Sequence, residues 1–234
     1  MAHMIPAEPK EFDARSHEGI VFEALKKLPD SYYVFHSVET VAVTDTNELL
    51  AKETDFLVVN KQLGALTIEV KAGDGIYYED GQWHYTSGLL MPHGGPYRQA
   101  RTASATLRRL VKDHTNPAVA SMVNHIKFVS AVWFPDMAQD RVNRIPFGSD
   151  ANKKITLCYD DLVDPRPAIE RIMAIEISIG NSYIENRMTD GKYMELQLIC
   201  SFSPETYPLL YLKEHGLSGN VQGPRRFEIP VIQS

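Results

Sequence analysis

The chain has 234 residues, a length that suits one large domain or one domain with an appendage. Hydrophobic residues make up 44% and charged residues 23%, which excludes the disordered and membrane-embedded classes and favours a folded, soluble protein. The formal net charge of −6 argues against a protein that coats nucleic acid through bulk positive charge, so a nucleic-acid site has to be local.

The first fifty residues predict a helix followed by a long extended segment. Met1–Met4 resembles a cloning remnant, and we assign it no element of the fold. Apolar residues recur at helical spacing over Ser16–Leu28, which predicts an amphipathic helix. The β-branched and aromatic residues of Tyr32–Val43 predict one long strand or two short ones. The polar stretch Thr44–Lys52 predicts a loop.

Two hairpins are predicted next. The apolar runs Thr54–Asn60 and Ala65–Lys71 are joined by the short loop Lys61–Gly64, which predicts two paired central strands. After a turn at Gly73–Gly75, the pair Asp80-Gly81 marks a second hairpin. Its two strands are expected at Ile76–Tyr78 and Trp83–Thr86.

The rest of the chain predicts alternating helices and strands. In chain order these are a strong helix at Tyr97–His114, a shorter helical segment up to Asn124, a buried strand at His125–Phe134, a strand at Ile155–Tyr159 and a helix at Pro167–Ile177. The element order predicts an α/β domain with a mixed sheet. We expect residues 1–13 to be a lead-in, 14–180 to form the domain, and 181–234 to be an extension or linker.

Cysteine number and the length of apolar runs limit the class of site and the location. Cys158 and Cys200 are too few for a disulfide scaffold, a four-thiolate zinc site or an iron–sulfur cluster, and both lie in apolar segments typical of buried, inert thiols. No apolar run reaches the roughly 18 residues of a membrane helix, and no secretory signal is recognisable. We therefore expect a cytoplasmic protein with no membrane partner.

The first hairpin carries the charges that indicate chemistry. Side chains alternate faces along a strand, so Glu69 and Lys71 lie on one face, side by side with Thr67. If the two runs pair through their short loop, Asp55 falls opposite the end of the second strand, close to Glu69. Two carboxylates beside a lysine make a site for a hard divalent cation such as magnesium. The simpler explanation is a strand-edge carboxylate and a surface salt bridge, although charges inside apolar central strands are unusual.

Such a site suits the cleavage of a phosphodiester bond. The reaction needs a nucleophilic water, a Lewis acid on the phosphoryl oxygen and stabilisation of the developing charge, all of which a metal and a lysine can supply. The pattern Asp-x13-Glu-x-Lys, here Asp55, Glu69 and Lys71, resembles the PD-(D/E)xK nuclease superfamily. Thr54 stands where the superfamily name has proline.

Five ordered segments make the resemblance more specific. They are Ser-His-Glu-Gly with Glu18, Asp55-Phe-Leu-Val-Val-Asn60, Ile68-Glu-Val-Lys-Ala-Gly73, Gly81-Gln-Trp83 and Pro96-Tyr-Arg-Gln-Ala100. Together they are similar to the NERD, or nuclease-related domain, family over residues 14 to 135. The resemblance implies a restriction-endonuclease-like mixed central sheet flanked by helices. It also implies DNA cleavage that depends on Mg²⁺ or Mn²⁺.

The resemblance also implies roles for individual residues. Asp55, Glu69 and the main-chain carbonyl of Val70 would hold the metal. Lys71 would orient the attacking water and stabilise the phosphoryl charge.

Two helical residues would support this site. Glu18 continues the buried stripe of the first helix, and Gln99 points toward the sheet from the start of the later helix. The simpler explanations are that Glu18 favours the positive end of its helix and that Gln99 is a polar residue at a helix start.

Two further groups are candidate nucleic-acid contacts. Arg98 and Arg101 lie nearest the expected site on a basic arc of the long helix, where they would contact phosphates, although a solvated helix surface has the same pattern. The second hairpin carries Tyr77, Tyr78 and Trp83, which either stack on bases or pack across the hairpin.

The sequence therefore predicts a metal-dependent deoxyribonuclease with DNA as its substrate. A helicase or other DNA-processing protein, or a second copy of the chain, is an expected partner, and the absence of Gly-Lys-Ser/Thr excludes a phosphate-binding loop of its own. Three alternatives stay open. They are a non-catalytic nucleic-acid-binding or partner-docking module that keeps the fold, a homodimer of the resolvase or restriction type that cuts both strands, and a nuclease of RNA.

Overall fold

The computed structural model describes residues 1–8, 12, 15–43, 49–114, 117–149 and 151–176, with the short strands 178–179 and 182–183. At 41–43, 49–52, 118 and these two short strands the backbone alone is described. The second cysteine, Cys200, and nearly all of the expected extension 181–234 lie outside the described residues.

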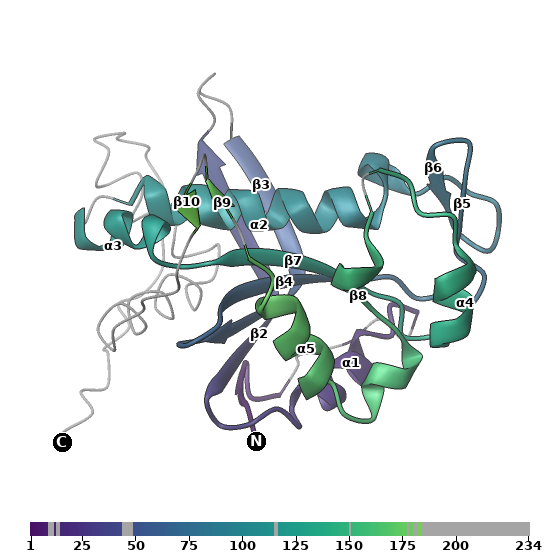
Figure 1. The fold of residues 1–234 in the computed structure, drawn as a ribbon, viewed down its shortest axis with the longest axis horizontal. Coiled ribbons are helices and arrows are strands. Elements are labelled where there is room, and N and C mark those ends of the chain that lie inside the picture. The colour runs from purple at the N-terminus through teal and green to yellow at the C-terminus, as the bar shows by residue number, and fades with distance from the viewer. Residues whose placement is uncertain are drawn as a thin grey trace, which may run out of the picture.

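A six-stranded mixed sheet forms the centre of the molecule (Figure 1). Its strands, in spatial order, are β1 His3–Ile5, β2 Tyr32–Val43, β3 Leu49–Asn60, β4 Gly64–Val70, β7 Phe128–Trp133 and β8 Thr156–Leu157. The pairs β2–β3 and β3–β4 are antiparallel, whereas β1–β2, β4–β7 and β7–β8 are parallel. With helices on both faces, this is the mixed α/β arrangement of a restriction-endonuclease-like fold, as the sequence predicts.

Helices cover both faces of the sheet (Figure 1). On one face lie α1 Glu18–Leu25 and α5 Arg166–Met173, packed against Phe56, Val58 and Ile68. On the other lies α2 Pro96–Lys112, followed by α3 Pro117–Ser121, over Leu57 and Val59. Because neighbouring residues of β3 alternate between these two cores, the strand is apolar at every position from Phe56 to Val59.

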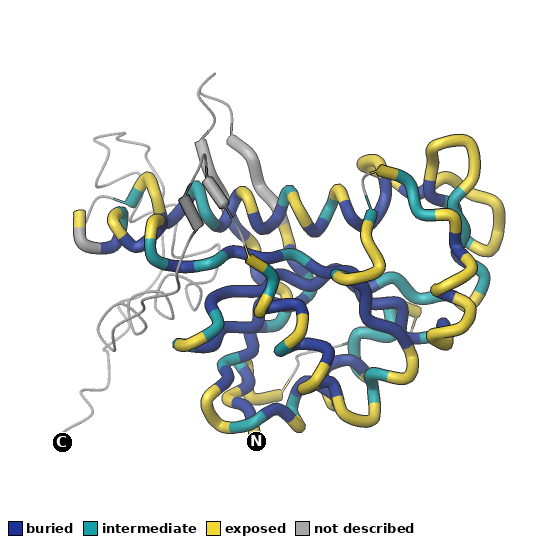
Figure 2. The backbone as a smooth tube through the Cα atoms, in the orientation of Figure 1, coloured by how far each residue is buried: buried dark blue, intermediate teal, exposed yellow. Residues whose placement is uncertain are grey.

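Smaller elements complete the described part of the chain. They are β5 Tyr77–Glu79, β6 Gln82–His84, α4 Gln139–Arg144 and the 3₁₀ helices η1 Pro92–Gly94, η2 Met122–Asn124, η3 Lys153–Ile155 and η4 Tyr159–Leu162; β9 Ser178–Ile179 pairs with β10 Ser182–Tyr183. A third apolar cluster joins the β5–β6 hairpin to α2 and α4 through Trp83, Tyr97 and Val142. Figure 2 shows the buried centre of the molecule along β4 and β7. No helix in the described part of the chain is both long and apolar enough to cross a membrane.

A glycine fixes the turn that joins the central strands. Gly64 has a φ of 109°, and a Cβ there would lie 2.5 Å from the carbonyl oxygen of Lys127. The same carbonyl accepts a hydrogen bond from the N–H of Ala65. Glycine therefore allows β4 to begin directly against the segment that leads into β7.

Several predicted boundaries are wrong for physical reasons. The predicted loop Thr44–Lys52 contains the start of β3, because Leu49–Lys52 pairs with the long strand β2. The segment Met1–Met4, for which the sequence predicts no element, contributes His3 and Met4 to β1, and Met4 is buried where it covers the edge of β2. The predicted strand Ile155–Tyr159 shrinks to Thr156–Leu157, with a 3₁₀ turn on each side. The six-residue helix α4 has a single buried side chain, Val142, too few to produce a helical pattern.

The thiol of Cys158 is buried beyond the end of β8, as the sequence predicts. Burial, followed by the nearby charge of Asp161, raises the pKa of this thiol to about 12. It is therefore an unreactive group at neutral pH.

Candidate active site

The central hairpin opens at the position of Asp55. The β3–β4 ladder ends at the pair Phe56 and Ile68, so the next opposed residues, Asp55 and Glu69, are not paired through their backbones. The β2–β3 ladder is interrupted at Asp55 as well. Asp55 lies opposite Ser37, whose φ is 52°, and these two residues are not paired. Asp55 thus lies at an interruption of both ladders, where its side chain replaces backbone pairing.

The Asp55 carboxylate is anchored to the neighbouring strand. Its Oδ2 accepts a hydrogen bond of 2.6 Å from the N–H of Val70, the last residue of β4. Within the described part of the chain, its Oδ1 has no hydrogen-bond partner, and the atom is not sealed from solvent. The side chain is held in place and still offers one oxygen to a ligand.

Glu69 and Lys71 form the ion pair that strand alternation predicts. The Lys71 ammonium donates a hydrogen bond to Oε1 of Glu69, and these side chains are only 17% and 7% exposed, respectively. Lys71 itself follows β4, and its N–H donates to the carbonyl of Trp133 on β7. The pair is therefore fixed at the carboxyl end of two adjacent parallel strands.

Burial disfavours the ionised forms of the Asp55 and Glu69 carboxylates. Burial first, and the charge of Glu69 second, raise the pKa of Asp55 from 3.8 to about 8, against the opposing effect of the Val70 N–H. Burial also raises the pKa of Glu69, although Lys71 opposes this change. Two neighbouring carboxylates that resist ionisation are typical of a site completed by a cation.

Lys71 stays protonated in this environment. Burial acts to lower the pKa of Lys71, but the charge and hydrogen bond of Glu69, together with Asp55, outweigh it and the pKa is raised. The side chain therefore acts as a cation and hydrogen-bond donor at neutral pH, and not as a base.

Glu18 reaches the same region from the first turn of α1. Its Oε2 lies 2.9 Å from Nε2 of His36 on β2, and the imidazole is held between the rings of Phe12 and Phe56 at 4.9 and 5.0 Å. The hydrogen bond with His36 lowers the pKa of Glu18, to which the charge of Lys71 also contributes. Glu18 is thus an ionised carboxylate facing the sheet, as predicted.

Asp136 joins the segments that carry these side chains, and no motif in the sequence identifies it. Its Oδ1 lies 2.7 Å from Nδ1 of His17, the residue before α1, and its Oδ2 accepts a 2.6 Å hydrogen bond from the N–H of Gly73. One carboxylate therefore fixes the start of the helix with Glu18 to the segment just after Lys71. Because His17 and Asp136 are 119 residues apart, only the folded chain reveals the contact.

Three predicted site residues, Arg98, Gln99 and Arg101, lie at the start of α2. Gln99 donates from Nε2 to the carbonyl of Pro92 at 2.8 Å, so its amide is engaged with η1 and not with the carboxylates. Arg98 is exposed over Gly94, and Arg101 is exposed one turn further along the helix. The structure brings Glu18, Asp55, Glu69 and Lys71 together, and it leaves these three residues at the start of α2.

The aromatic residues of the second hairpin pack across it. The rings of Tyr77 and His84 stack with centroids 4.9 Å apart, and Tyr78 tilts against Trp83 at 5.2 Å. Trp83 is 2% exposed and belongs to the core, so it is not available to stack on a base. Tyr77 and Tyr78 remain partly exposed.

The donor set fits a hard cation. Asp55 and Glu69 each have one oxygen engaged by a protein donor and one without a partner among the described residues, and carboxylate oxygens are the ligands that magnesium prefers. A divalent cation would also favour the ionised form of both carboxylates, against the burial that raises their pKa values. Among the described residues, no three His, Cys, Asp or Glu side chains converge closely enough to hold a metal by themselves.

Comparison with known proteins gives one result for the chain. Residues 14–135, just over half of the sequence, match the profile of NERD, the nuclease-related domain. The match spans the strands and helices that carry Glu18, Asp55, Glu69 and Lys71. No curated protein and no solved structure matches the chain significantly.

Proposed function

The chain belongs to the nuclease-related domain family, and from that premise we propose that it is a divalent-metal-dependent nuclease that hydrolyses phosphodiester bonds of DNA. The observation that carries the proposal is the pairing of two carboxylates, the partly buried Asp55 and the buried Glu69, beside a protonated lysine. Such an arrangement costs free energy in the metal-free protein, so a role in binding a cation explains why the fold contains it.

Asp55, Glu69 and the carbonyl of Val70 would hold Mg²⁺ or Mn²⁺. The bound ion would supply a Lewis acid for the phosphoryl oxygen and a water of lowered pKa. Asp55 contributes a fixed oxygen, because the Val70 N–H holds its other one. Glu69 contributes its second oxygen while Lys71 holds the first.

Lys71 would stabilise charge on the phosphoryl group. Its raised pKa keeps the ammonium protonated, and its three N–H donors allow it to bind Glu69 and a phosphoryl oxygen or a water together. Glu18 would accept a hydrogen bond from the attacking water, because its lowered pKa keeps it ionised. Gln99, Arg98 and Arg101 would contact the substrate from the start of α2.

A manganese soak of a crystal of the full chain tests the site. The proposal predicts anomalous density between the carboxylates of Asp55 and Glu69. Density at another place, or a site that stays occupied only by the Lys71 ammonium at millimolar manganese, would contradict it. A crystal of the Asp55→Asn variant in the same solution serves as the control, since the amide keeps the side-chain shape and removes the charge.

One observation favours a second candidate, a nucleic-acid-binding module without catalysis. In the described residues no third side-chain ligand joins the two carboxylates, and the lysine already neutralises one of them. Such a module would bind DNA with an affinity that depends on salt but is indifferent to chelation and to Glu69→Gln. The nuclease proposal predicts that both treatments change DNA binding or cleavage.

A further inference from the structure

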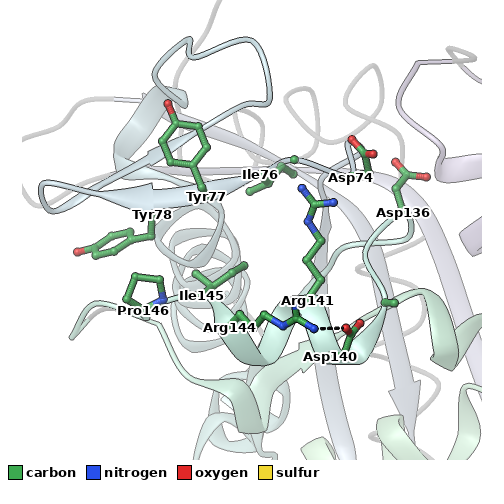
Figure 3. A pocket seen from close by; sticks show the side chains of 12 residues that line it. Asp74, Ile76, Tyr77, Tyr78, Asp136, Asp140, Arg141, Arg144, Ile145 and Pro146 are labelled. Atoms are coloured by element: carbon green, nitrogen blue, oxygen red, sulfur yellow. Dashed lines mark hydrogen bonds and ion pairs between the residues drawn. The ribbon is translucent and has the colours of Figure 1, made fainter.

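A pocket of about 800 Å³ lies beside the carboxylate cluster, between the approach to β5 and helix α4 (Figure 3). One wall is Asp74–Tyr78, and the other runs from Asp136 through α4 to Pro146. The first wall starts three residues after Lys71, and the second follows the end of β7. The hydrogen bond from the N–H of Gly73 to Asp136 joins the two walls at this end, two residues along the chain from Lys71, so this end of the pocket neighbours the segment that carries the lysine of the candidate active site.

Three of the five charged side chains that line the pocket are engaged by other protein groups. Arg144 binds Asp140 at 2.8 Å, and Asp136 is engaged by His17 and the Gly73 N–H. Arg141 is different, because within the described residues its guanidinium has no ion-pair or hydrogen-bond partner. In Figure 3 it extends from α4 across the pocket, toward Ile76 and Asp74. It is a cation placed to bind an anionic ligand.

The opposite part of the pocket offers rings and apolar surface. Tyr77, Tyr78 and Pro146 line it, and the same three residues line a second hollow of about 540 Å³ toward the turn of the hairpin. The two hollows therefore share a border and form one surface that leads from Asp136 to the hairpin turn. A cation together with aromatic faces along a continuous surface is the combination that holds single-stranded nucleic acid.

The dimensions and chemistry select an unpaired strand over a duplex. Bases inside a duplex have both faces covered by their neighbours, so a protein ring stacks only on a base that has left the helix. An open pocket of this size, bordered by α4 on one side and by the hairpin approach on the other, suits a nucleotide and not a double helix.

We propose that this pocket receives an unpaired nucleotide of the DNA strand beside the scissile bond, with Arg141 on a phosphate and Tyr77 or Tyr78 against the base. The inference rests on the proposed nuclease function and adds a substrate class, DNA with a single-stranded segment. Asp74, the lining carboxylate without a partner among the described residues, weakens the binding of a phosphate at this place.

The test measures the binding of labelled DNA by fluorescence anisotropy. The full chain carrying Lys71→Ala, in magnesium, is titrated against a single strand, a blunt duplex of the same sequence and the corresponding RNA strand. We expect tighter binding to single-stranded DNA than to the duplex, and Arg141→Ala to weaken single-strand binding about five- to tenfold. Tyr77→Leu is expected to weaken single-strand binding while duplex binding stays unchanged. Asp74→Asn is expected to strengthen single-strand binding.

Arg171→Ala is the matched control, because it removes the same charge from an exposed position on α5, on the opposite face of the sheet. Equal losses for Arg141→Ala and Arg171→Ala would overturn the assignment of the pocket. Equal affinity for the blunt duplex, or tighter binding of RNA, would overturn the substrate class. Anisotropy requires no cleavage, so the expected binding pattern together with a wild-type chain that cuts no DNA would contradict the proposed nuclease function and leave the pocket assignment standing.

Discussion

Replacement of Asp55 by asparagine should stabilise the metal-free protein while it abolishes cleavage. Asparagine has nearly the same shape as aspartate, and its carbonyl oxygen can accept the hydrogen bond that the Val70 N–H donates to Asp55 Oδ2. The substitution removes a carboxyl whose ionisation is opposed by burial and by the charge of Glu69. Stability and activity should therefore change in opposite directions.

The size of the effect follows from the pKa of Asp55. Because its pKa is raised from 3.8 to about 8, the folded state holds a proton that the unfolded state has lost throughout this range. The free energy of unfolding of the wild-type chain therefore falls as the pH rises, by about 1.4 kcal/mol per pH unit at most. Between pH 5 and pH 8 the wild type should lose about 2 to 4 kcal/mol relative to Asp55→Asn, the lower value allowing for relaxation around the ionised group.

Urea unfolding at pH 5, 6, 7 and 8 in chelator measures this difference. Tryptophan fluorescence reports it well, since Trp83 and Trp133 are both buried. Asp30→Asn, at an exposed position between α1 and β2, controls for the loss of one carboxylate. Parallel curves for the wild type and Asp55→Asn across this range would refute the reasoning, because the ionisation of Asp55 would then be independent of folding.

Three further predictions concern the same network. Metal binding at pH 7 should release close to one proton, because the Asp55 carboxyl, whose pKa is about 8, has to ionise. Calorimetry in two buffers of different ionisation enthalpy measures the number of protons released, and no release would contradict the assignment of Asp55 as a ligand. His36→Phe keeps the ring packing but removes the hydrogen bond that lowers the pKa of Glu18, so the acidic limb of the pH–rate profile should move to higher pH. An unchanged profile would exclude Glu18 from the reaction. Asp136→Asn keeps an acceptor for the N–H of Gly73 and should lower the free energy of unfolding by about 1 kcal/mol, whereas Asp136→Ala should lower it by about 2 to 3 kcal/mol. Urea unfolding measures both values, and equal losses would show that this hydrogen bond is unimportant.

The central strands and the long helix could be predicted from the sequence because their signals are local. The loop Lys61–Gly64 sets the register of the hairpin, and the pair Phe56 and Ile68 then makes Asp55 and Glu69 the next opposed residues. The short elements β1 and α4 have no such signal. Each is stabilised by what it covers, the edge of β2 in one case and the Trp83 cluster in the other.

The same division applies to the candidate site. Alternation along β4 predicts that Lys71 lies beside Glu69, and the helical period predicts that Glu18 faces the sheet. The contacts that set their charge states could not be predicted, because they join distant segments. The Val70 N–H on Asp55 depends on the interruption of two ladders, and the position of Asp136 depends on the path of the chain after β7.

The most direct test of the central claim is a cleavage assay with the purified full chain. Labelled single-stranded, duplex and single-strand-tailed DNA would be incubated with wild-type protein and with Lys71→Ala, in magnesium, in manganese and in chelator. We expect cleavage by the wild type only with a metal, and none by Lys71→Ala, with the two proteins equally folded by circular dichroism. Equal cleavage in chelator, equal cleavage by Lys71→Ala, or intact DNA in every reaction would contradict it.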